Sequence, residues 1–321
     1  MTATTPRTSP APPTTRGGLT LLAMATTVVL WASAFVAIRA VGHDVDAGPL
    51  TLGRVAVGSV ALTAMVAVVR ARRRATTPAA GGIPARGRLP HGRLLALVAV
   101  WGVAWFGGYN LTLNAAEQHL DAGTTALLVN IAPMLVAVLA GLFLGEGFPR
   151  RLLVGIAVAF TGVLLIAVAT SAGQFDAAGV LLGLASAVLY AGAATLQKRL
   201  LPHLDALTMT WLGCLAGTVV TLPFLPALVD QLAAAPTSAV LGIVYLGLFP
   251  TAIAFSTWGY VLSRSSAGRA AASTYAVPAL VVLMSWALLD EVPAPAALVG
   301  GVLALTGVAV ATIPRRPVRA R

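Results

Sequence analysis

The sequence carries the same apolar pattern twice, and the two copies are 145 residues apart. The first copy covers residues 129–162 and the second covers residues 274–307. Each copy has an apolar stretch with an internal proline, then an acidic residue, then a second apolar stretch. The matched pairs include Pro133 with Pro278 and Glu146 with Glu291. A period close to half of the chain length indicates a duplicated fold, so each half is expected to build the same set of elements.

The composition places these elements in a membrane. Of the 321 residues, 58% are hydrophobic and only 10% are charged, whereas soluble domains carry roughly 25% charged residues. One soluble core of this size would need polar surface that the chain lacks. The single cysteine, Cys214, lies in an apolar segment, which excludes an intrachain disulfide and a thiolate metal cluster. We expect neither a metal site nor a cofactor.

The apolar segments are long enough to cross a bilayer, which takes roughly 20 apolar residues. Ten spans are predicted, at about residues 18–41, 48–69, 94–115, 121–144, 151–170, 177–198, 206–227, 237–262, 267–289 and 295–313. A secretory signal is the alternative for the first span, because residues 32–34 resemble a cleavage site. We expect no cleavage, because this span has a counterpart in the second half. The aligned pairs are Trp31 with Tyr190 and Arg39 with Lys198.

The charged residues predict the orientation. Of the 21 Lys and Arg residues, 19 lie in the termini and in the loops after even-numbered spans. Eight of the ten acidic residues lie in the loops after odd-numbered spans. Because positively charged loops stay in the cytoplasm, both termini are expected there, in a multi-pass protein of the cytoplasmic (inner) membrane. The net charge of +11 is then a topology signal and does not indicate nucleic-acid binding.

These patterns predict an all-α integral membrane protein with about ten transmembrane helices in two inverted five-helix repeats. The repeats are inverted because an odd number of spans brings the second half in from the opposite face. The predicted organisation is a disordered cytoplasmic tail at 1–17, a first repeat at 18–170 with a basic cytoplasmic loop at 70–93, a second repeat at 177–314 and a basic cytoplasmic tail at 315–321.

With this arrangement the chain resembles the drug/metabolite transporter superfamily, specifically its ten-helix EamA-type transporters. The residues that carry the resemblance are Trp31 to Phe35 in the first span, Pro49 and Arg54 in the second, and the two proline-to-acid stretches. The likeness covers about residues 18–314. It implies efflux or exchange of small organic solutes and names no particular solute.

The two prolines lie about 20 Å from their acids at 1.5 Å per helical residue, and therefore well inside the hydrocarbon. Pro133 and Pro278 cannot bond the carbonyls four residues earlier, those of Val129 and Thr274. A helix kink that serves packing and a carbonyl that lines the solute path are both open interpretations.

Polar and aromatic side chains within the spans are the candidates for the solute path. Lipid penalises polar groups, so these residues are expected to face an aqueous cavity. Asn110, Asn114 and Glu117 share one helical face, which should look inward. For Arg54, snorkelling to the interface is an equally open alternative. The predicted substrate-binding residues are Trp31, Arg54, Asn110, Asn130, Tyr190 and Tyr275.

The charged residues at the span ends are expected to be structural. Glu146 and Glu291 are predicted to cap the helices that follow them, where the helix dipole is positive, and not to couple protons. Arg39 and Lys198 are predicted to anchor their spans at the interface. We expect no buried carboxylate within the spans, which argues against an obligate cation as the substrate.

The sequence thus predicts a secondary transporter that exports small organic solutes, such as amino acids or related metabolites, by alternating access. An uncoupled facilitator or channel is the alternative. An intramembrane enzyme is not expected, because the chain has no GxSxG or HExxH motif. The expected partners are a small-molecule solute and the lipid bilayer, without nucleic acid, and a homodimer is left open.

Overall fold

The computed structural model of the protein describes residues 15–76, 89–143, 150, 154–155, 157–158, 161–162, 165, 176–264, 270, 274, 276–291 and 295–312. Throughout these residues the regular elements are helices, as the apolar spans predict. Glu146 and Tyr275 lie outside the described residues, as does most of the predicted span at 151–170.

The helices follow the predicted spans closely. Those of the first half are α1 (Thr15–Val41), α2 (Ala47–Thr76), α3 (Gly92–Gly102), η2 (Val103–Tyr109), α4 (Asn110–His119), α5 (Ala122–Val129) and α6 (Ala132–Phe143). Those of the second half are α8 (Ala177–Leu200), α9 (Ala206–Thr221), η3 (Leu222–Phe224), α10 (Leu225–Ala234), α11 (Thr237–Leu246), η4 (Gly247–Ile253), α12 (Ala254–Arg264), α14 (Ala276–Leu289) and α15 (Pro295–Thr312). The segments η2 and η4 are π-helices at matching places in the two halves.

Among the described residues, six helical stretches are long and apolar enough to cross a bilayer, and three shorter apolar helices accompany them. The outward side chains of these helices are apolar. Leu21, Val60 and Leu181, for example, are each more than 60% exposed. Lipid solvates such side chains whereas water does not. The exposed apolar surface therefore confirms an all-helical membrane fold.

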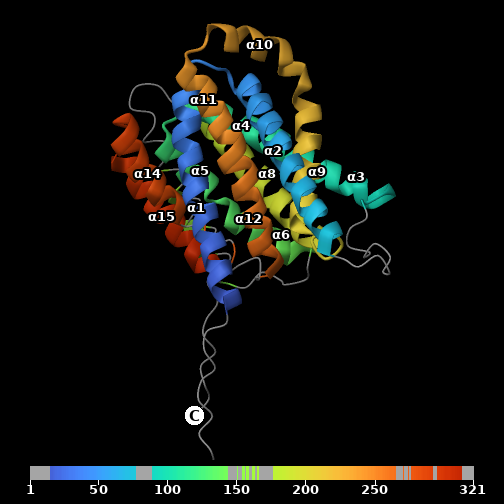
Figure 1. Ribbon diagram of the computed structural model, residues 1–321. Coiled ribbons are helices and arrows are strands. Elements are labelled where there is room, and N and C mark those ends of the chain that lie inside the picture. Colours follow the sequence, from blue (N-terminus) through green and yellow to red (C-terminus); the bar gives the residue numbers. More distant parts are fainter. Residues whose placement is uncertain are drawn as a thin grey trace, which may run out of the picture.

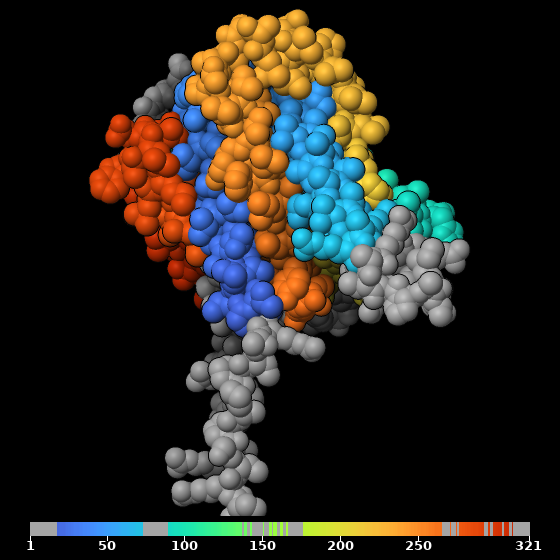
Figure 2. Space-filling view, in the orientation of Figure 1, coloured from blue at the N-terminus to red at the C-terminus, as the bar shows by residue number. Residues whose placement is uncertain are grey.

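The helices of the two halves pack in matching pairs. Helix α1 contacts α12 and α14, and its repeat counterpart α8 contacts α4 and α6. In the same way α2 contacts η4, while its counterpart α9 contacts η2. Figure 2 shows α11 and α12 of the second half as an orange column between α1 and α2 of the first half. Because the halves interleave, both contribute to the interior.

The ends of the bundle differ in what covers them. Helix α1 begins and α15 ends at the same end of the bundle (Figure 1). At the other end α10 lies across the helices (Figure 1). There the Gln231 side chain accepts a hydrogen bond from the backbone N–H of Asp46, between α1 and α2 (2.9 Å). This contact ties the first half to the second at the end that α10 covers.

Aspartate side chains cap several of the helices. Asp121 caps α5, Asp176 caps α8 and Asp205 caps α9, each by accepting a backbone N–H at 2.9–3.0 Å. In Asp176 the bond from the Gly179 backbone, and after it the bond from the His119 ring, lowers the pKa of the carboxyl. Caps of this kind satisfy backbone donors that have no partner within the helix.

Helices α3 and α9 cross at a pair of glycines. A Cβ atom added to Gly102 would lie 2.4 Å from both the Cα and the carbonyl oxygen of Gly213. A Cβ atom on Gly213 would lie 2.2 Å from the Trp101 ring. Small residues allow membrane helices to approach to backbone contact. This crossing therefore requires glycine on both helices.

Candidate functional site

A cavity lies where the two halves meet. It is lined by Trp31, Phe35, Arg54, Tyr109, Leu113, Val129, Asn130, Ala132, Pro133, Tyr190, Phe255, Thr274 and Val277. These residues come from both halves, and three pairs are repeat counterparts: Trp31 with Tyr190, Val129 with Thr274, and Ala132 with Val277. The cavity has a volume of about 30 Å³, and one water needs roughly 10–15 Å³. In this conformation it is too small for an amino acid.

Aromatic rings form one wall of the cavity. Trp31 lies 6.0 Å from Tyr190, 5.4 Å from Phe255 and 5.2 Å from Trp258 between ring centroids. Trp31 and Tyr190 were predicted to lie near a central cavity, and both line the cavity in the structure. The indole N–H of Trp31 is buried and has no hydrogen-bond partner among the described residues. It is a donor that a solute could use.

Arg54 supplies the positive charge of the cavity. It is only 2% exposed, so the structure favours the buried interpretation over snorkelling. Its Nε donates to the Thr251 hydroxyl and its Nη1 donates to the Asn114 amide oxygen, both at 3.4 Å, beyond the roughly 2.7–3.2 Å of ordinary bonds. Among the described residues, no carboxylate forms an ion pair with it. The guanidinium therefore has the capacity to bind an anionic group.

The proline of the first half breaks its span completely. Helix α5 ends at Val129, Asn130 and Ile131 form a turn, and α6 begins at Ala132. Pro133 has no N–H to give to the Val129 carbonyl. The Asn130 amide donates to the Ala126 carbonyl (3.4 Å), while its Oδ1 is buried with no partner among the described residues. The end of α5 thus brings two hydrogen-bond acceptors to the cavity.

The second half differs from this arrangement. The Thr274 carbonyl, predicted to lack a bond because of Pro278, accepts one from the Val277 N–H (3.0 Å). The expectation of a free carbonyl there is wrong, because α14 begins just before Pro278 and its first turn supplies another donor. Pro278 is buried near the start of α14 and is not among the residues that line the cavity.

Asn110 does not line the cavity. Its side-chain amide donates to the carbonyls of Trp105 (3.0 Å) and Phe106 (3.2 Å) in η2. A π-helix leaves carbonyls displaced from the usual α-helical donors, and Asn110 supplies donors to them. Its repeat counterpart Phe255 is the residue that reaches the cavity wall. Phe255 was interpreted from the sequence as a packing residue and was not among the predicted substrate-binding residues, although it is the repeat counterpart of Asn110.

The predicted inward face of α4 is buried in full. Asn110, Asn114 and Glu117 are each 1% exposed or less. Asn114 donates to the Thr51 hydroxyl (2.8 Å) and accepts from Arg54. The expectation that no carboxylate is buried within the spans is wrong. Glu117 lies only two residues before the end of α4, but the packing of α1, α2 and α8 against that helix removes it from water.

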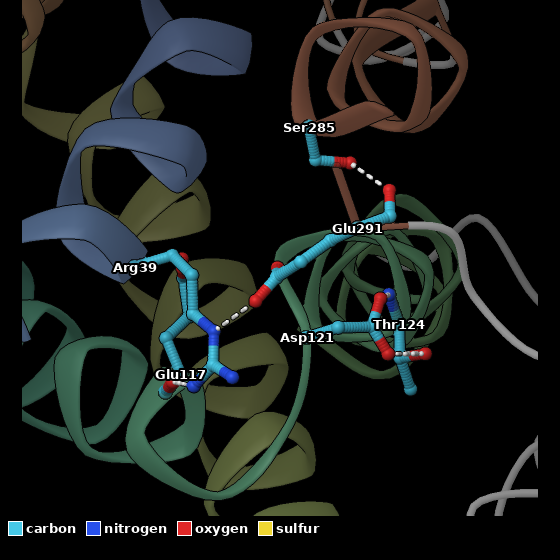
Figure 3. A network of polar contacts seen from close by, with 6 residues as sticks. All are labelled: Arg39, Glu117, Asp121, Thr124, Ser285 and Glu291. Carbon is cyan, nitrogen blue, oxygen red and sulfur yellow. Dashed lines mark hydrogen bonds and ion pairs between the residues drawn. The ribbon is translucent and has the colours of Figure 1, made fainter. Parts of the chain in front are cut away.

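Glu291 pairs with a residue of the first half. Its carboxylate lies 2.8 Å from the Arg39 Nε, and Arg39 also donates from Nη1 to the Glu117 carbonyl (2.7 Å). Figure 3 shows Arg39 between Glu117 and Glu291. Sequence analysis predicted that Glu291 caps the following helix. The structure joins Glu291 to Arg39, and because residues 292–294 lie outside the described part of the chain, the cap stays a prediction.

The contact of Arg39 with Glu117 is repeated in the second half. Lys198 donates from Nζ to the Leu262 carbonyl (2.8 Å). Lys198 is the repeat counterpart of Arg39, and Leu262 lies 145 residues after Glu117. At each end of the bundle, a basic side chain therefore binds the last turn of a neighbouring helix, where the dipole favours a cation.

We expect Glu291→Gln and Arg39→Gln each to lower thermal stability in detergent, with a non-additive double variant. Both side chains are about one quarter exposed, so the coupling free energy should be about 1 kcal/mol, the upper end for surface pairs. Thermal unfolding of the four proteins measures this value. Asp290→Asn is the control, because Asp290 is exposed and forms no ion pair among the described residues. Additive effects would show that the Arg39–Glu291 pair contributes nothing to stability. In transport assays, Glu291→Gln should keep the pH dependence of the wild type.

The family model described as the EamA-like transporter family matches the chain twice, over residues 18–168 and 177–313. This chain belongs to the EamA-like transporter family. The two matches together cover most of the sequence and agree with the repeat seen in the residue pattern. This EamA-like protein is thus a membrane transporter of small solutes.

Several relatives of this EamA-like protein carry informative names. It is 39% identical over 286 residues to a protein of Streptantibioticus cattleyicolor named "Probable terminal-alkyne amino-acid exporter", with 89% of this chain and 91% of the relative covered. It is 33% identical to the uncharacterised transporter YdfC of Bacillus subtilis, over 87% of this chain and 86% of the relative. A "Probable amino-acid metabolite efflux pump" of Salmonella typhimurium is 25% identical, over 87% of this chain and 90% of the relative.

A solved crystal structure has the same fold. It covers 92% of this chain and 97% of its own, with a TM-score of 0.59 and 22% sequence identity. Within the described residues of this EamA-like protein, no group of three His, Cys, Asp or Glu side chains is placed to hold a metal ion. The polar side chains that line the cavity are those of Trp31, Arg54, Tyr109, Asn130, Tyr190 and Thr274.

Proposed function

We propose that this transporter exports amino acids with small apolar side chains by alternating access through the cavity. One observation carries the proposal. Within the described residues, a buried arginine without an ion pair and a broken helix end with an unpartnered amide oxygen border the same apolar cavity. An α-amino acid presents a carboxylate and an ammonium group, which need a cation and a set of oxygen acceptors.

The carboxylate of the solute binds Arg54. A guanidinium presents several N–H donors in a plane and bonds both oxygens of a carboxylate at once. The hydrogen bonds of Arg54 to Thr251 and Asn114 are long, so a solute replaces weak contacts with charge-assisted ones. The indole N–H of Trp31 is a further donor beside it.

The ammonium group of the solute binds the carboxyl end of α5. The Val129 carbonyl and the Asn130 Oδ1 are acceptors there, and the negative end of the helix dipole favours a cation. Broken helices in transporters commonly place backbone carbonyls at the solute site. The aromatic wall of Trp31, Tyr190 and Phe255 then receives an apolar side chain. Relatives named as amino-acid exporters support this choice of substrate class.

The two halves move about the cavity during transport. At about 30 Å³ the cavity admits only water-sized groups, so a solute requires the halves to separate on one side or the other. We propose that residues 18–170 and 177–314 are the two moving halves, in the cytoplasmic membrane. In this proposal the protein does not modify the solute, and the solute is released chemically unaltered.

A counterflow experiment tests the proposal. Proteoliposomes are loaded with unlabelled propargylglycine, an amino acid with a terminal alkyne, and uptake of the labelled form is followed. We expect transient accumulation of labelled propargylglycine and competition by neutral amino acids. Propargylglycine amide and the corresponding acid without the amino group should compete at least tenfold more weakly. Mass spectrometry of the recovered solute should show it unaltered. Equal competition by all three compounds would exclude recognition of the zwitterion, and a modified solute would point to an enzyme.

The proposed orientation has its own test. In a Cys214→Ser background, Asp44→Cys and His91→Cys place single thiols at exposed positions between α1 and α2 and before α3. Because positive loops stay inside, a membrane-impermeant thiol reagent on intact cells should label Asp44→Cys and spare His91→Cys. Permeabilised cells serve as the control and should show both labelled. Labelling of His91→Cys in intact cells would reverse the orientation.

A further inference from the structure

Glu117 is a buried acid that the solute site leaves unused. It is 1% exposed. Neither of its carboxyl oxygens has a hydrogen-bond partner among the described residues. Around it, Asn114 bonds Thr51 at 2.8 Å and the backbone carbonyl of Glu117 accepts from Arg39 at 2.7 Å, while the Asn110 Oδ1 is a further acceptor without a partner in the described part of the chain. Within the described residues, both oxygens of the Glu117 carboxyl group are thus left without a bond.

A carboxylate in such a site is costly, and a buried acid without a partner takes up a proton instead. The charged groups that act on Glu117 do not remove this cost, because burial has the largest effect and the two cations are opposed by two anions. They are Arg39 from α1, Arg54 from α2, Asp121 before α5 and Glu291 after α14. Tyr109 in η2 and the His119–Asp176 pair, which joins α4 to α8, are the other titratable groups nearby.

Glu117 also lies between the cavity and the surface. Leu113, one helical turn earlier on α4, lines the cavity, and one turn is about 5.4 Å along the axis. On its other side Arg39 covers the Glu117 backbone and pairs with Glu291 (Figure 3). Because Arg39 and Glu291 belong to different halves, separation of the halves on this side breaks their pair and admits water to Glu117.

We propose that Glu117 is the proton-binding site through which solute export is exchanged for proton uptake. When the halves separate beside Arg39 and Glu291, the Glu117 carboxylate is hydrated and takes a proton from water. When the halves close again, water is excluded from the protonated, neutral Glu117. This closed arrangement is the one in this structure. When the opposite side opens, water reaches Glu117 through the cavity, and the proton leaves the carboxyl group to that side.

The small size of the cavity is the reason why the proton and the solute are exchanged and not carried together. The conformation in which Glu117 is dry has a cavity of about 30 Å³, which holds about two waters and no amino acid. The proton and the solute are therefore carried by different conformations, and they cross in opposite directions. The coupling rests on the proposed function, whereas the binding of a proton at Glu117 does not.

Infrared spectroscopy tests proton binding without any solute. The reconstituted protein should show the C=O stretch of a protonated carboxylic acid, and Glu117→Gln should lose it. Glu291→Gln is the matched control and should keep the band, because it removes the neighbouring acid and leaves Glu117 in place. Glu117→Leu is a second variant, chosen because the repeat counterpart of Glu117 is Leu262. A band that persists in both Glu117 variants would overturn the proposal.

Transport then tests the coupling. External acid should speed efflux of labelled propargylglycine from wild-type proteoliposomes. A pH difference of two units should sustain up to about a 100-fold solute gradient, if one proton exchanges per solute. Glu117→Gln should keep counterflow and lose this pH response. Full pH response in Glu117→Gln, or efflux slowed by external acid in the wild type, would overturn the exchange. Absence of counterflow in the wild type would contradict the choice of solute, and the infrared band would still decide proton binding.

Discussion

Replacement of Arg54 by glutamine is expected to weaken transport of zwitterionic amino acids roughly 10- to 150-fold, the loss of one charge-assisted contact of about 1.5–3 kcal/mol. Glutamine keeps a polar group in the cavity and removes the positive charge. The effect should appear in the KM for propargylglycine in proteoliposomes at matched protein levels. The KM for propargylglycine amide, which lacks the carboxylate, should change much less.

The control for this variant is Arg70→Gln on the same helix. Arg70 lies over the ring of Trp211, 5.4 Å from its centroid, and outside the residues that line the cavity. Its replacement should leave both KM values close to those of the wild type. If Arg54→Gln impaired the amino acid and its amide equally, Arg54 would serve packing and not carboxylate recognition.

Gly102→Val is expected to cause the largest loss of stability. Overpacking costs typically about 1–3 kcal/mol, and this case should reach or exceed the upper end. The reason is that the new Cβ meets backbone atoms of Gly213 at 2.4 Å, which cannot rotate away as a side chain does. Size-exclusion chromatography after heating in detergent should show loss of the folded protein at a temperature well below that of the wild type.

The matched control is Gly192→Val on α8. A Cβ atom at Gly192 meets nothing within 4 Å, and the position is exposed to the surroundings of the bundle. This variant makes the same chemical change in a helix and should unfold within a few degrees of the wild type. Similar losses in both variants would mean that the helical preference of glycine and valine, and not the crossing of α3 and α9, determines the result.

The sequence predicts the spans and the shared cavity well, for a physical reason. Apolar length identifies helices that lipid surrounds, and duplication relates one half to the other. The alignment of Trp31 with Tyr190 thus placed two rings that lie 6.0 Å apart in the structure. The helical period of Asn110, Asn114 and Glu117 likewise identified the buried face of α4.

Other features depend on packing that the sequence does not display. Phe35, Leu113 and Val277 line the cavity, but an apolar residue in an apolar span carries no signal of its position. Glu291 stands next to a helix start in the sequence, yet its partner Arg39 is 252 residues away. Asn110 is polar and central, but the donors that η2 needs are visible only once the π-helix is known.

Alternating access through the cavity is tested most directly by a single cysteine at Ala132. This small residue lines the cavity, and Ala132→Cys in the Cys214→Ser background adds little volume. An impermeant thiol reagent should label it both in intact cells and in inside-out vesicles, and propargylglycine should slow labelling from each side. Labelling from one side alone, or at a rate that the solute does not change, would contradict a solute path that opens alternately to both faces.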